Sequence, residues 1–346
     1  MLFFLDITNN MIRVTTTTNS SDDAELSTFT ILSYNCLSSS AEKPKMFPRT
    51  DPKYLKFDYR SKLLEQEFRQ FNADIVCLQE IVVNDFHKWF TPTMLLLGYA
   101  EGLFTKCEEA EDGEAIFFKK DKFSLVKHRS IDYNARAKQV SSSLCDKNSS
   151  IVCVFEIIGN PQKQQLCVVN MHLSHLYEQP EVQLFQLKML MAEVETMASS
   201  LPLVFAGDTN SFLLSVPTDY IRDGCISKSS RFFKRLLSAF TPVFNDDVQK
   251  ATEYLTEKHR YSDEKLLPAY SNQTFELIFT VYCAPLFGTT PDRIWFQQDR
   301  LRVIELLDPL MKDAGQTSLR NFTLPNAEHP SDHLPIMARL QLLNAD

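Results

Sequence analysis

Short apolar runs along this chain alternate with segments of helical periodicity. The runs that predict β-strands are residues 29–33, 75–79, 114–118, 151–157, 166–170, 203–205, 293–296 and 334–340. Helices are predicted for residues 58–71, with Asp58 as the N-cap, and 180–197, with Pro180 in the first turn. Apolar residues recur at helical spacing in these two segments at Leu64, Phe68, Phe71, Leu187, Leu190, Met191, Val194 and Met197. Strands interleaved with amphipathic helices predict a layered α/β fold.

The composition agrees with a single folded domain. The chain has 346 residues, of which 44% are apolar, enough for a substantial core. We expect residues 28–346 to form a single catalytic domain and residues 1–27 to form a flexible tail or an edge strand; the segment 15–25 is rich in Thr, Ser, Asn and Asp. No apolar stretch reaches the roughly 18 residues of a membrane span. No basic leader precedes the apolar residues 1–5, which argues against a secretory signal.

Charge and cysteine content limit the function classes. A net charge of -8 argues against broad polyanion binding, although local basic runs such as 119–122 and 231–235 could border a groove for a short oligonucleotide. None of the eight cysteines forms a C-x-x-C pair, and Cys77, Cys153 and Cys167 lie within apolar runs. Buried thiols of a reducing compartment explain them best. We therefore expect an intracellular monomer that binds no membrane, located in the cytoplasm, with the mitochondrion and nucleus left open.

Polar residues with catalytic chemistry stand at the ends of several predicted strands. In chain order they are Asn35, Glu80, His172, Asp208, Asn210, Asp292, Asp332 and His333. Each alone has a structural explanation, for example Asp208 as a turn residue or His172 as a buried, hydrogen-bonded strand histidine. Their joint occurrence is better explained by strand ends that converge on one pocket.

These residues resemble the endonuclease/exonuclease/phosphatase superfamily, whose fold is that of deoxyribonuclease I. The resemblance rests on an Asn after the first strand, a Gln-Glu pair, a His, a Gly-Asp-X-Asn motif, a late Asp and a terminal Ser-Asp-His, all in this order between residues 29 and 343. It implies a four-layer α/β/β/α sandwich of two packed mixed sheets flanked by helices.

Within the superfamily the chain is most similar to the branch of the catabolite-repressor deadenylases, nocturnin, Angel and the 2',5'-phosphodiesterases. The motifs that carry this similarity are residues 33–35, 58–60, 72–80, 117–123 and 329–333. Thr209 and Arg293 depart from the branch, which usually has an aromatic residue and a Tyr there. The tyrosyl-DNA phosphodiesterases resemble this chain at those two positions, so DNA-end repair stays open as an alternative function.

Hydrolysis of a phosphodiester needs a metal site, a base and donors to the phosphate. Glu80, Asn35 and Asp332 are the predicted ligands of Mg²⁺, for which Mn²⁺ can substitute, because magnesium prefers such oxygen donors. Asp208 would deprotonate the attacking water. Asn210, on the same side as Asp208 if the segment is extended, would donate to the developing charge on phosphorus. The resemblance implies the same roles.

Two histidines and Asp292 complete the predicted site. His172 and His333 would contact phosphate oxygens, and Asp292 would fix the tautomer of His333 and raise its basicity. Phe287 is the candidate for stacking on a base, and Arg293 is a candidate substrate contact.

The sequence therefore predicts a magnesium-dependent phosphodiesterase. We expect it to shorten single-stranded RNA from the 3' end, acting on oligoadenylate as a poly(A) deadenylase or a 2',5'-oligoadenylate phosphodiesterase. Protein partners that would recruit it are unknown. A sugar-phosphate or sphingolipid phosphodiesterase has no lipid-docking segment to support it. A catalytically silent scaffold for RNA or protein is the alternative from another class, and the complete set of polar site residues argues against it.

Overall fold

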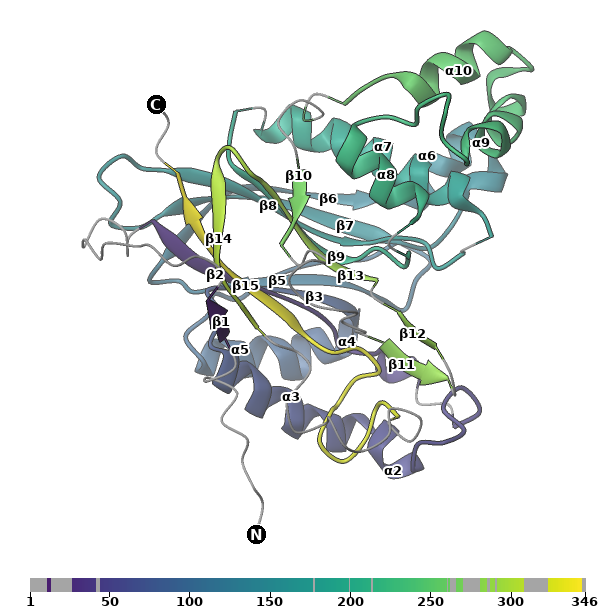
Figure 1. The fold of residues 1–346 in the computed structure, drawn as a ribbon. Coiled ribbons are helices and arrows are strands. Elements are labelled where there is room, and N and C mark those ends of the chain that lie inside the picture. The colour runs from purple at the N-terminus through teal and green to yellow at the C-terminus, as the bar shows by residue number, and fades with distance from the viewer. Residues whose placement is uncertain are drawn as a thin grey trace.

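Two β-sheets pack face to face, with helices covering both outer faces (Figure 1). The computed structural model describes residues 11–13, 27–41, 44–176, 178–198, 200–212, 214–259, 261, 266–269, 281–284, 287–289, 291–307 and 323–343. Two mixed sheets with helices on both outer faces are the predicted α/β/β/α sandwich.

The seven-stranded sheet has the strand order β1-β14-β15-β2-β3-β5-β4. Its strands are β1 (Met11–Arg13), β2 (Thr28–Asn35), β3 (Ile75–Val82), β4 (Leu103–Thr105), β5 (Asp112–Phe118), β14 (Leu301–Leu307) and β15 (Ile336–Leu342). β2 and β3 are parallel, and their neighbours are antiparallel. The helical elements that precede and follow β3 are η2 (Ser39–Ala41), α2 (Pro52–Leu55), α3 (Phe57–Phe71), α4 (Val83–Asp85), η3 (Phe86–Phe90) and α5 (Thr91–Leu96).

The six-stranded sheet has the order β10-β13-β9-β8-β7-β6. Its strands are β6 (Phe123–Asp132), β7 (Ser149–Ile157), β8 (Gln165–His172), β9 (Leu203–Asp208), β10 (Leu266–Pro268) and β13 (Asp292–Gln297). β8 and β9 are parallel. The helical elements on this side are α6 (Tyr133–Val140), η4 (Ser142–Leu144), α7 (Pro180–Ala198), α8 (Val216–Asp223), α9 (Phe233–Phe240), η5 (Pro242–Phe244) and α10 (Val248–Thr256). A separate hairpin joins β11 (Val281–Ala284) to β12 (Phe287–Thr289).

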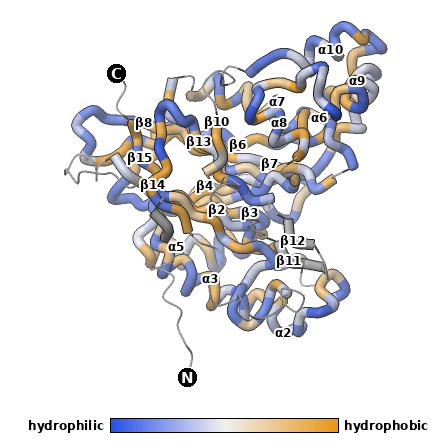
Figure 2. Tube along the Cα trace, in the orientation of Figure 1, coloured by the Kyte–Doolittle hydropathy of each residue, from blue (hydrophilic) through white to orange (hydrophobic). Residues whose placement is uncertain are grey.

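Three large apolar clusters lie one between each pair of neighbouring layers, and a small fourth cluster consists of Leu37, Phe47 and Leu55. The central cluster lies between the sheets and includes Ile31, Ile116 and Val168. The other two large clusters pack α3 and α5 against one sheet and α7 against the other. Figure 2 shows the hydrophobic positions concentrated along the strands, with hydrophilic ones in the turns and on outer surfaces. Among the described helices, none has the length and apolar content needed to cross a bilayer.

All of the predicted strands and both helices are present, with some boundaries displaced. The last strand starts at Ile336, after Pro335, which has no amide hydrogen to donate to a neighbouring strand. Asp58 was wrongly predicted as an N-cap: α3 begins at Phe57, and Asp58 lies within its first turn. Residues 15–25 lie outside the described part of the chain, whereas β1 pairs with β14 at the sheet edge.

Two long strands, β6 and β14, were not predicted from the sequence, because no uninterrupted apolar run marks them. β6 is the last strand at one side of its sheet and is exposed on both faces over residues 126–130, so it has neither an apolar run nor an alternation. In β14, Arg302 and Glu305 interrupt the apolar residues.

The predicted buried thiols are confirmed. Cys77, Cys153 and Cys167 lie within β3, β7 and β8, fully buried and without a disulfide bond. Burial raises the pKa of the Cys167 thiol to about 12, which keeps it protonated.

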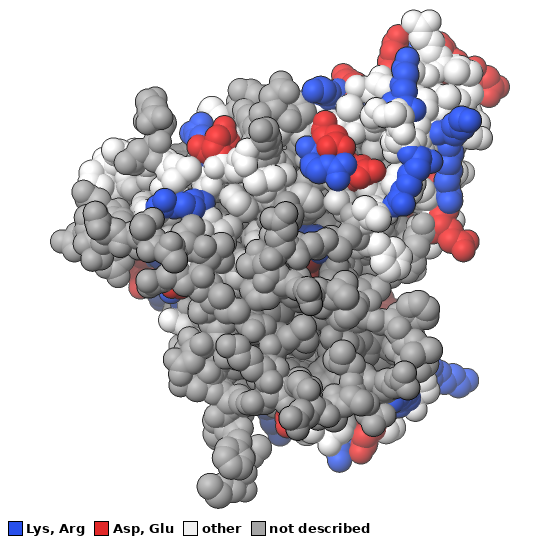
Figure 3. Space-filling view, in the orientation of Figure 1, with Lys and Arg blue, Asp and Glu red and all other residues white. Residues whose placement is uncertain are grey.

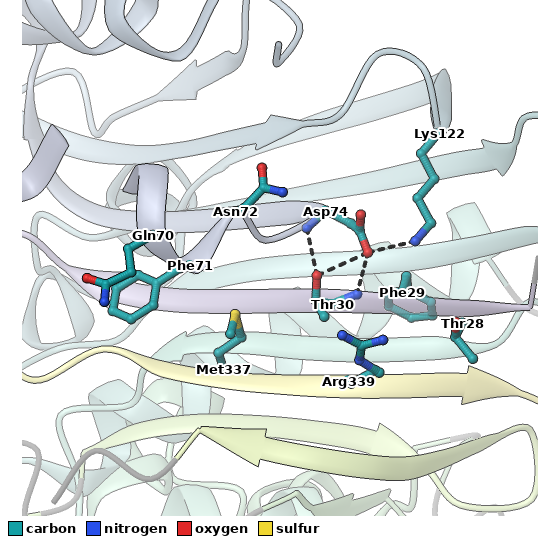
Figure 4. A pocket seen from close by; sticks show the side chains of 10 residues that line it. All are labelled: Thr28, Phe29, Thr30, Gln70, Phe71, Asn72, Asp74, Lys122, Met337 and Arg339. Atoms are coloured by element: carbon teal, nitrogen blue, oxygen red, sulfur yellow. Dashed lines mark hydrogen bonds and ion pairs between the residues drawn. The ribbon is translucent and has the colours of Figure 1, made fainter. Parts of the chain in front are cut away.

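The hollow in Figure 4 lies at the far end of the seven-stranded sheet from the polar motif at residues 329–333, and Asp74, Thr30 and Lys122 in its lining pair with one another. One oxygen of Asp74 accepts hydrogen bonds from the amide and the hydroxyl of Thr30, at 2.7 and 3.0 Å. Lys122 Nζ lies 2.8 Å from the same oxygen. Lys119 Nζ donates to Leu97 O at 2.7 Å. Two lysines of the basic run 119–122 therefore hold the turn before β6 in place.

A buried pair of amide side chains joins the two sheets. Gln79 Nε2 of β3 donates to Asn170 Oδ1 of β8 at 2.7 Å. Asn170 Nδ2 donates in turn to Leu78 O and Ala115 O, both at 2.9 Å, on β3 and β5. Both side chains are fully buried. Because unpaired polar groups are costly in a core, this pair fixes how one sheet lies against the other.

Replacing Asn170 by Leu should reduce the free energy of unfolding by roughly 3 kcal/mol, because the buried groups it pairs would lose their partner. Urea denaturation measures the change. Asn160, in the turn between β7 and β8, is the matched control, and Asn160→Leu should cost less than about 1 kcal/mol. An equal decrease in the free energy of unfolding in the two variants would show that the buried Gln79–Asn170 pair stabilises the protein no more than a surface amide does.

Candidate active site

The predicted polar residues meet at one edge of the sandwich because of strand direction. Asn35, His172 and Asp208 are the last residues of β2, β8 and β9. Asp292 is the first residue of β13, which runs antiparallel to β9 and places Asp292 opposite Asp208. His172 is the register partner of Asp208 on its other side. The two parallel pairs, β2-β3 and β8-β9, thus end at the same place.

Asp208 lies at the centre of this cluster and is almost fully buried. Its Oδ2 accepts a hydrogen bond from Asn35 Nδ2 at 3.1 Å. The same oxygen lies 3.7 Å from His333 Nε2 and 3.8 Å from His172 Nε2. Its Oδ1 accepts from the amide of Asn210 at 2.7 Å. Asp208 therefore sits between two imidazoles in a fixed orientation.

Gly207 makes this close approach of β8 and β9 feasible. Its φ is +144°, and a Cβ at this position would lie 1.8 Å from the carbonyl oxygen of Met171. Only glycine fits there without moving β8 or β9. The Gly of the Gly-Asp-X-Asn motif thus sets the distance between Asp208 and His172.

Glu80 owes its position to an irregularity of β3. The strand does not end at Gln79 as predicted but continues to Val82, with a shift in its pairing to β5 between Leu78 and Ile81. Glu80 has a φ of +59° in this bulge. Its Oε1 accepts from Asn35 Nδ2 at 2.8 Å, and its Oε2 accepts from the amide of Ser38 at 3.1 Å.

Asn35 links two carboxylates. Its Nδ2 donates to both Glu80 and Asp208, while its Oδ1 accepts from the amide of Leu37 at 3.1 Å. In this orientation the amide oxygen points away from Glu80. The role of Asn35 as a metal ligand therefore stays a prediction, and the structure shows it holding two acids in register.

Asn210 reaches the site by a turn. The segment after Asp208 is not extended, since Asn210 has a φ of +45°. The side-chain amide of Asn210 donates to Leu173 O at 2.9 Å and lies 3.0 Å from His172 Nε2. The alternation argument for Asn210 was thus wrong, although the residue lies where the site needs it.

A buried carboxyl group that sequence reasoning missed accompanies His172. Glu114 Oε1 lies 3.6 Å from His172 Nδ1, and Ser149 Oγ donates to the other oxygen of Glu114. Burial alone would lower the pKa of His172, but the interaction with Glu114 and the charge of Asp208 raise it to about 10. His172 is therefore a cation at neutral pH.

Asp112 was missed as well. Burial raises its pKa, against a hydrogen bond from Ser38, and the charge of Glu80 adds to the rise. Asp112 and Glu114 lie two apart at the start of β5, so their side chains leave the strand on the same side. Alternating acids at the start of an antiparallel strand were the available signal, but the predicted strand began at Glu114.

His333 pairs with Asp292 as predicted from the sequence. Its Nδ1 lies 2.9 Å from Asp292 Oδ2 and 3.2 Å from Oδ1. Burial opposes the charge on the imidazole, but Asp292 and then Asp208 outweigh it and raise the pKa of His333 well above its usual value. The Nε2 atom is thereby left facing Asp208.

A buried arginine holds the loops that carry Asn35 and His333. Arg60 of α3 donates to Cys36 O at 2.7 Å, Leu37 O at 2.9 Å and Pro330 O at 3.2 Å. Ser331 Oγ also donates to Asn35 O at 2.6 Å. These bonds connect segments some 300 residues apart in the sequence.

The donor set fits a divalent cation. Side-chain atoms of Asp208, Asp292 and His333 lie within 4.8 Å of one another, in a geometry that could hold a metal ion. Burial and the charge of Glu80 raise the pKa of Asp332 to about 6, against the opposing charge of His333. So many buried carboxyl groups, with few basic side chains among them, favour a site that a cation would neutralise.

The remaining predicted residues lie at the margin of the cluster or outside it. Arg293 is only 7% exposed, and burial lowers its pKa to about 10 against the charges of Asp292 and Asp208. Thr209 is buried and its hydroxyl donates to Pro291 O at 2.7 Å. Phe287 lies in β12, but its side chain is outside the described part of the structure.

Comparisons with known proteins agree with this geometry. A family model described as the Endonuclease/Exonuclease/phosphatase family matches residues 32–333. The chain belongs to this family. The match begins in β2 and ends at His333, so it encloses every residue of the cluster.

Among curated relatives, the chain is 30% identical to the CCR4-Not complex 3'-5'-exoribonuclease subunit Ccr4 of Candida albicans, over 91% of this chain and 41% of that protein. It is also 30% identical to Carbon catabolite repressor protein 4 homolog 1 of Arabidopsis thaliana, over 92% of this chain and 58% of that protein. The chain thus spans about two fifths to three fifths of the length of these relatives.

Among solved structures, the chain is similar to ANGEL2, a 2',3'-cyclic phosphatase, in complex with adenosine-2',3'-vanadate. The TM-score is 0.75 at 25% identity, covering 91% of this chain and 96% of that one. This agrees with the branch that the sequence motifs indicated.

Gly207→Ala should destabilise the protein by several kcal/mol, since the new methyl group would overlap Met171 O and push β8 from β9. Gly159→Ala is the matched control, because Gly159 also has a positive φ, +79°, but a Cβ there meets nothing within 4 Å. Thermal unfolding of both variants separates the clash from the backbone strain that they share. Similar losses would contradict the role assigned to Gly207.

Proposed function

We propose that this chain is a magnesium-dependent phosphodiesterase that removes nucleotides from the 3' end of single-stranded RNA, with oligoadenylate as its substrate. Asp208 carries the proposal, because its carboxylate oxygen Oδ2 lies 3.8 Å from His172 Nε2 and 3.7 Å from His333 Nε2, where the ends of the strands meet. Relatives named as 3'-5'-exoribonucleases support the substrate class. Because these relatives are longer than this chain, their activity and their substrate are proposed for it.

Glu80 and Asp332, with Asn35 as the third predicted ligand, are the side chains that would hold the cation, so that Asp208 can act as the base. Oxygen donors in this number suit Mg²⁺, with Mn²⁺ as a substitute. Bound there, the cation would neutralise charge on the phosphoryl oxygens.

The residues of the chain supply proton transfer and orientation. Asp208 can accept the proton of an attacking water, and the amide of Asn210 fixes its Oδ1. His333, held through Nδ1 by Asp292, can donate from Nε2 to a phosphate oxygen. His172, held by Glu114, can do the same from the opposite side of Asp208. Two imidazolium groups would thus meet the charge that develops in the transition state.

A 2',3'-cyclic phosphatase is the second candidate, since the similar structure of ANGEL2 is described by that activity. The two residues that favoured DNA-end repair, Thr209 and Arg293, do not support it in the structure. Thr209 is committed to Pro291 O within the pairing of β9 and β13, and Arg293 is buried beside it.

A panel of substrates tests the proposal. The purified chain should, with magnesium, cut 3',5'-oligoadenylate or 2',5'-oligoadenylate faster than an oligouridylate of equal length, because purines stack better on an aromatic surface. Chelation of the metal should abolish the reaction. Faster turnover of a 2',3'-cyclic phosphate end or of 5'-tyrosyl DNA would replace the proposed substrate, and full activity in chelator would refute the metal site.

Asp208→Asn should lower the single-turnover rate by roughly 10²- to 10⁴-fold, the range typical of a general base, while RNA binding is retained. Adding His333→Ala should cost less than the product of the two separate losses, because both residues serve one transition state. Asp121→Asn, an exposed position at the far end of the sheet, is the control. A near-normal rate for Asp208→Asn would show that Asp208 is a structural turn residue and does not act as the base.

A further inference from the structure

The segment between α8 and α9 and the start of α9 carry a group of exposed basic side chains. These are Lys228, Arg231, Lys234 and Arg235, called the basic rim below. Figure 3 shows several Lys and Arg side chains, with Asp and Glu side chains among them, on the part of the surface formed by the helices of the six-stranded sheet. On a chain with a net charge of -8, such a local concentration of cations needs an explanation.

Two arginines attach the basic rim to the loops of the active site. Arg231 donates to Leu214 O, in the loop that follows Asp208 and Asn210. Arg235 donates to Glu178 O, in the loop that follows His172. The rim is therefore bonded to the two segments that leave the ends of β8 and β9, which carry His172 and Asp208.

Apolar side chains are exposed in one of these loops. Phe212 is 51% exposed and Leu214 is 70% exposed, four and six residues after Asp208. The Phe212 carbonyl accepts from Thr218 Oγ1 at 3.3 Å, which ties this loop to α8. An exposed aromatic ring in the loop that leaves the end of β9 offers a surface on which a base can stack.

The two acids of α8 near the rim share one arginine, which balances one of their two negative charges. Asp219 and Asp223 of α8 both pair with Arg222, at 3.1 and 2.6 Å. Glu178 contributes its carbonyl to Arg235. Lys228 and Lys234 form no hydrogen bond or ion pair with the residues that the structure describes, so their charges remain available to a ligand.

We propose that the basic rim and Phe212 bind the stretch of single-stranded RNA on the 5' side of the nucleotide in the active site. The inference rests on the proposed function, in which the 3' end occupies the site. Lys228 and Lys234 contact backbone phosphates, and Phe212 stacks on a base. Cations along a flexible strand combined with an aromatic ring are the usual means of binding single-stranded nucleic acid without base-specific hydrogen bonds.

The test is the double variant Lys228→Ala with Lys234→Ala, compared with Lys62→Ala with Lys120→Ala. The control pair removes the same charge from exposed positions on α3 and in the turn after β5. For a twenty-residue oligoadenylate, KM should rise about tenfold in the rim variant, with kcat unchanged. For a dinucleotide, which ends before the rim, KM should not change.

Salt dependence gives an independent measure. Each phosphate contact contributes a slope of roughly 0.7 in log affinity against log salt for a single strand. The rim variant should therefore show a slope smaller by about 1.4, and the control pair an unchanged slope. A normal KM for the long substrate, or the same increase in the control pair, would overturn the proposal. Equal increases for dinucleotide and long substrate would indicate a distorted site and overturn it too.

Phe212→Leu tests the stacking step, with Phe212→Tyr as the conservative control. The Leu variant should raise KM for oligoadenylate about fivefold and affect oligouridylate less, and the Tyr variant should behave like the unaltered protein. Equal effects on both substrates in the Leu variant would show that Phe212 does not stack on bases.

Failure of the proposed function would look different. A protein that cuts no oligonucleotide would refute the function, and the rim would still be tested by fluorescence anisotropy with labelled twenty-residue oligoadenylate in chelator. Loss of binding in the rim variant alone would support the proposal, and unchanged binding would overturn it. Polyglutamate that binds as tightly as the RNA would assign the rim to an acidic protein and contradict an RNA site.

Discussion

The hydrogen bonds between Gln79 and Asn170 set the geometry on which the active site depends. Gln79 precedes Glu80 in β3, and Asn170 is two residues before His172 in β8. Because the pair joins the two sheets, a shift of one sheet against the other would break buried hydrogen bonds as well as separate Glu80 from His172. The requirement to satisfy these amides therefore positions catalytic side chains that come from different sheets.

Electrostatics imposes the second constraint. The strand ends bring buried carboxyl groups together, which is costly unless opposite charges balance them. Glu114 and Asp292 each hold a histidine in its charged form, and both imidazoles face Asp208. The two pairs reduce the excess of negative charge, and the remainder favours a cation. The grouping of buried carboxyl groups is unfavourable by itself. With a bound cation and the two histidines, it would suit the negative charge of a phosphodiester.

The loops add what the strands do not provide. The catalytic residues lie at strand ends, whereas Phe212 and the basic rim lie on loops and helices that leave from them. Family membership and the shared fold account for the first group. The second group depends on how α8 and α9 are attached, through Arg231 and Arg235. The candidate catalytic residues and the residues proposed to bind RNA thus come from different layers.

The sequence by itself determined the α/β sandwich and the polar residues of the cluster, because apolar runs and motifs such as Gly-Asp-X-Asn are local. It did not reveal β6, because this edge strand has no apolar run. The alternating acids Asp112 and Glu114 were visible in the sequence, but their position beside Ser38 and His172 was not, because those residues come from other segments. Only the tertiary structure decided that Glu80 sits in a bulge, that Asn210 lies on a turn and that Arg293 is buried. Each depends on what packs against the residue, and that is fixed by segments distant in the sequence.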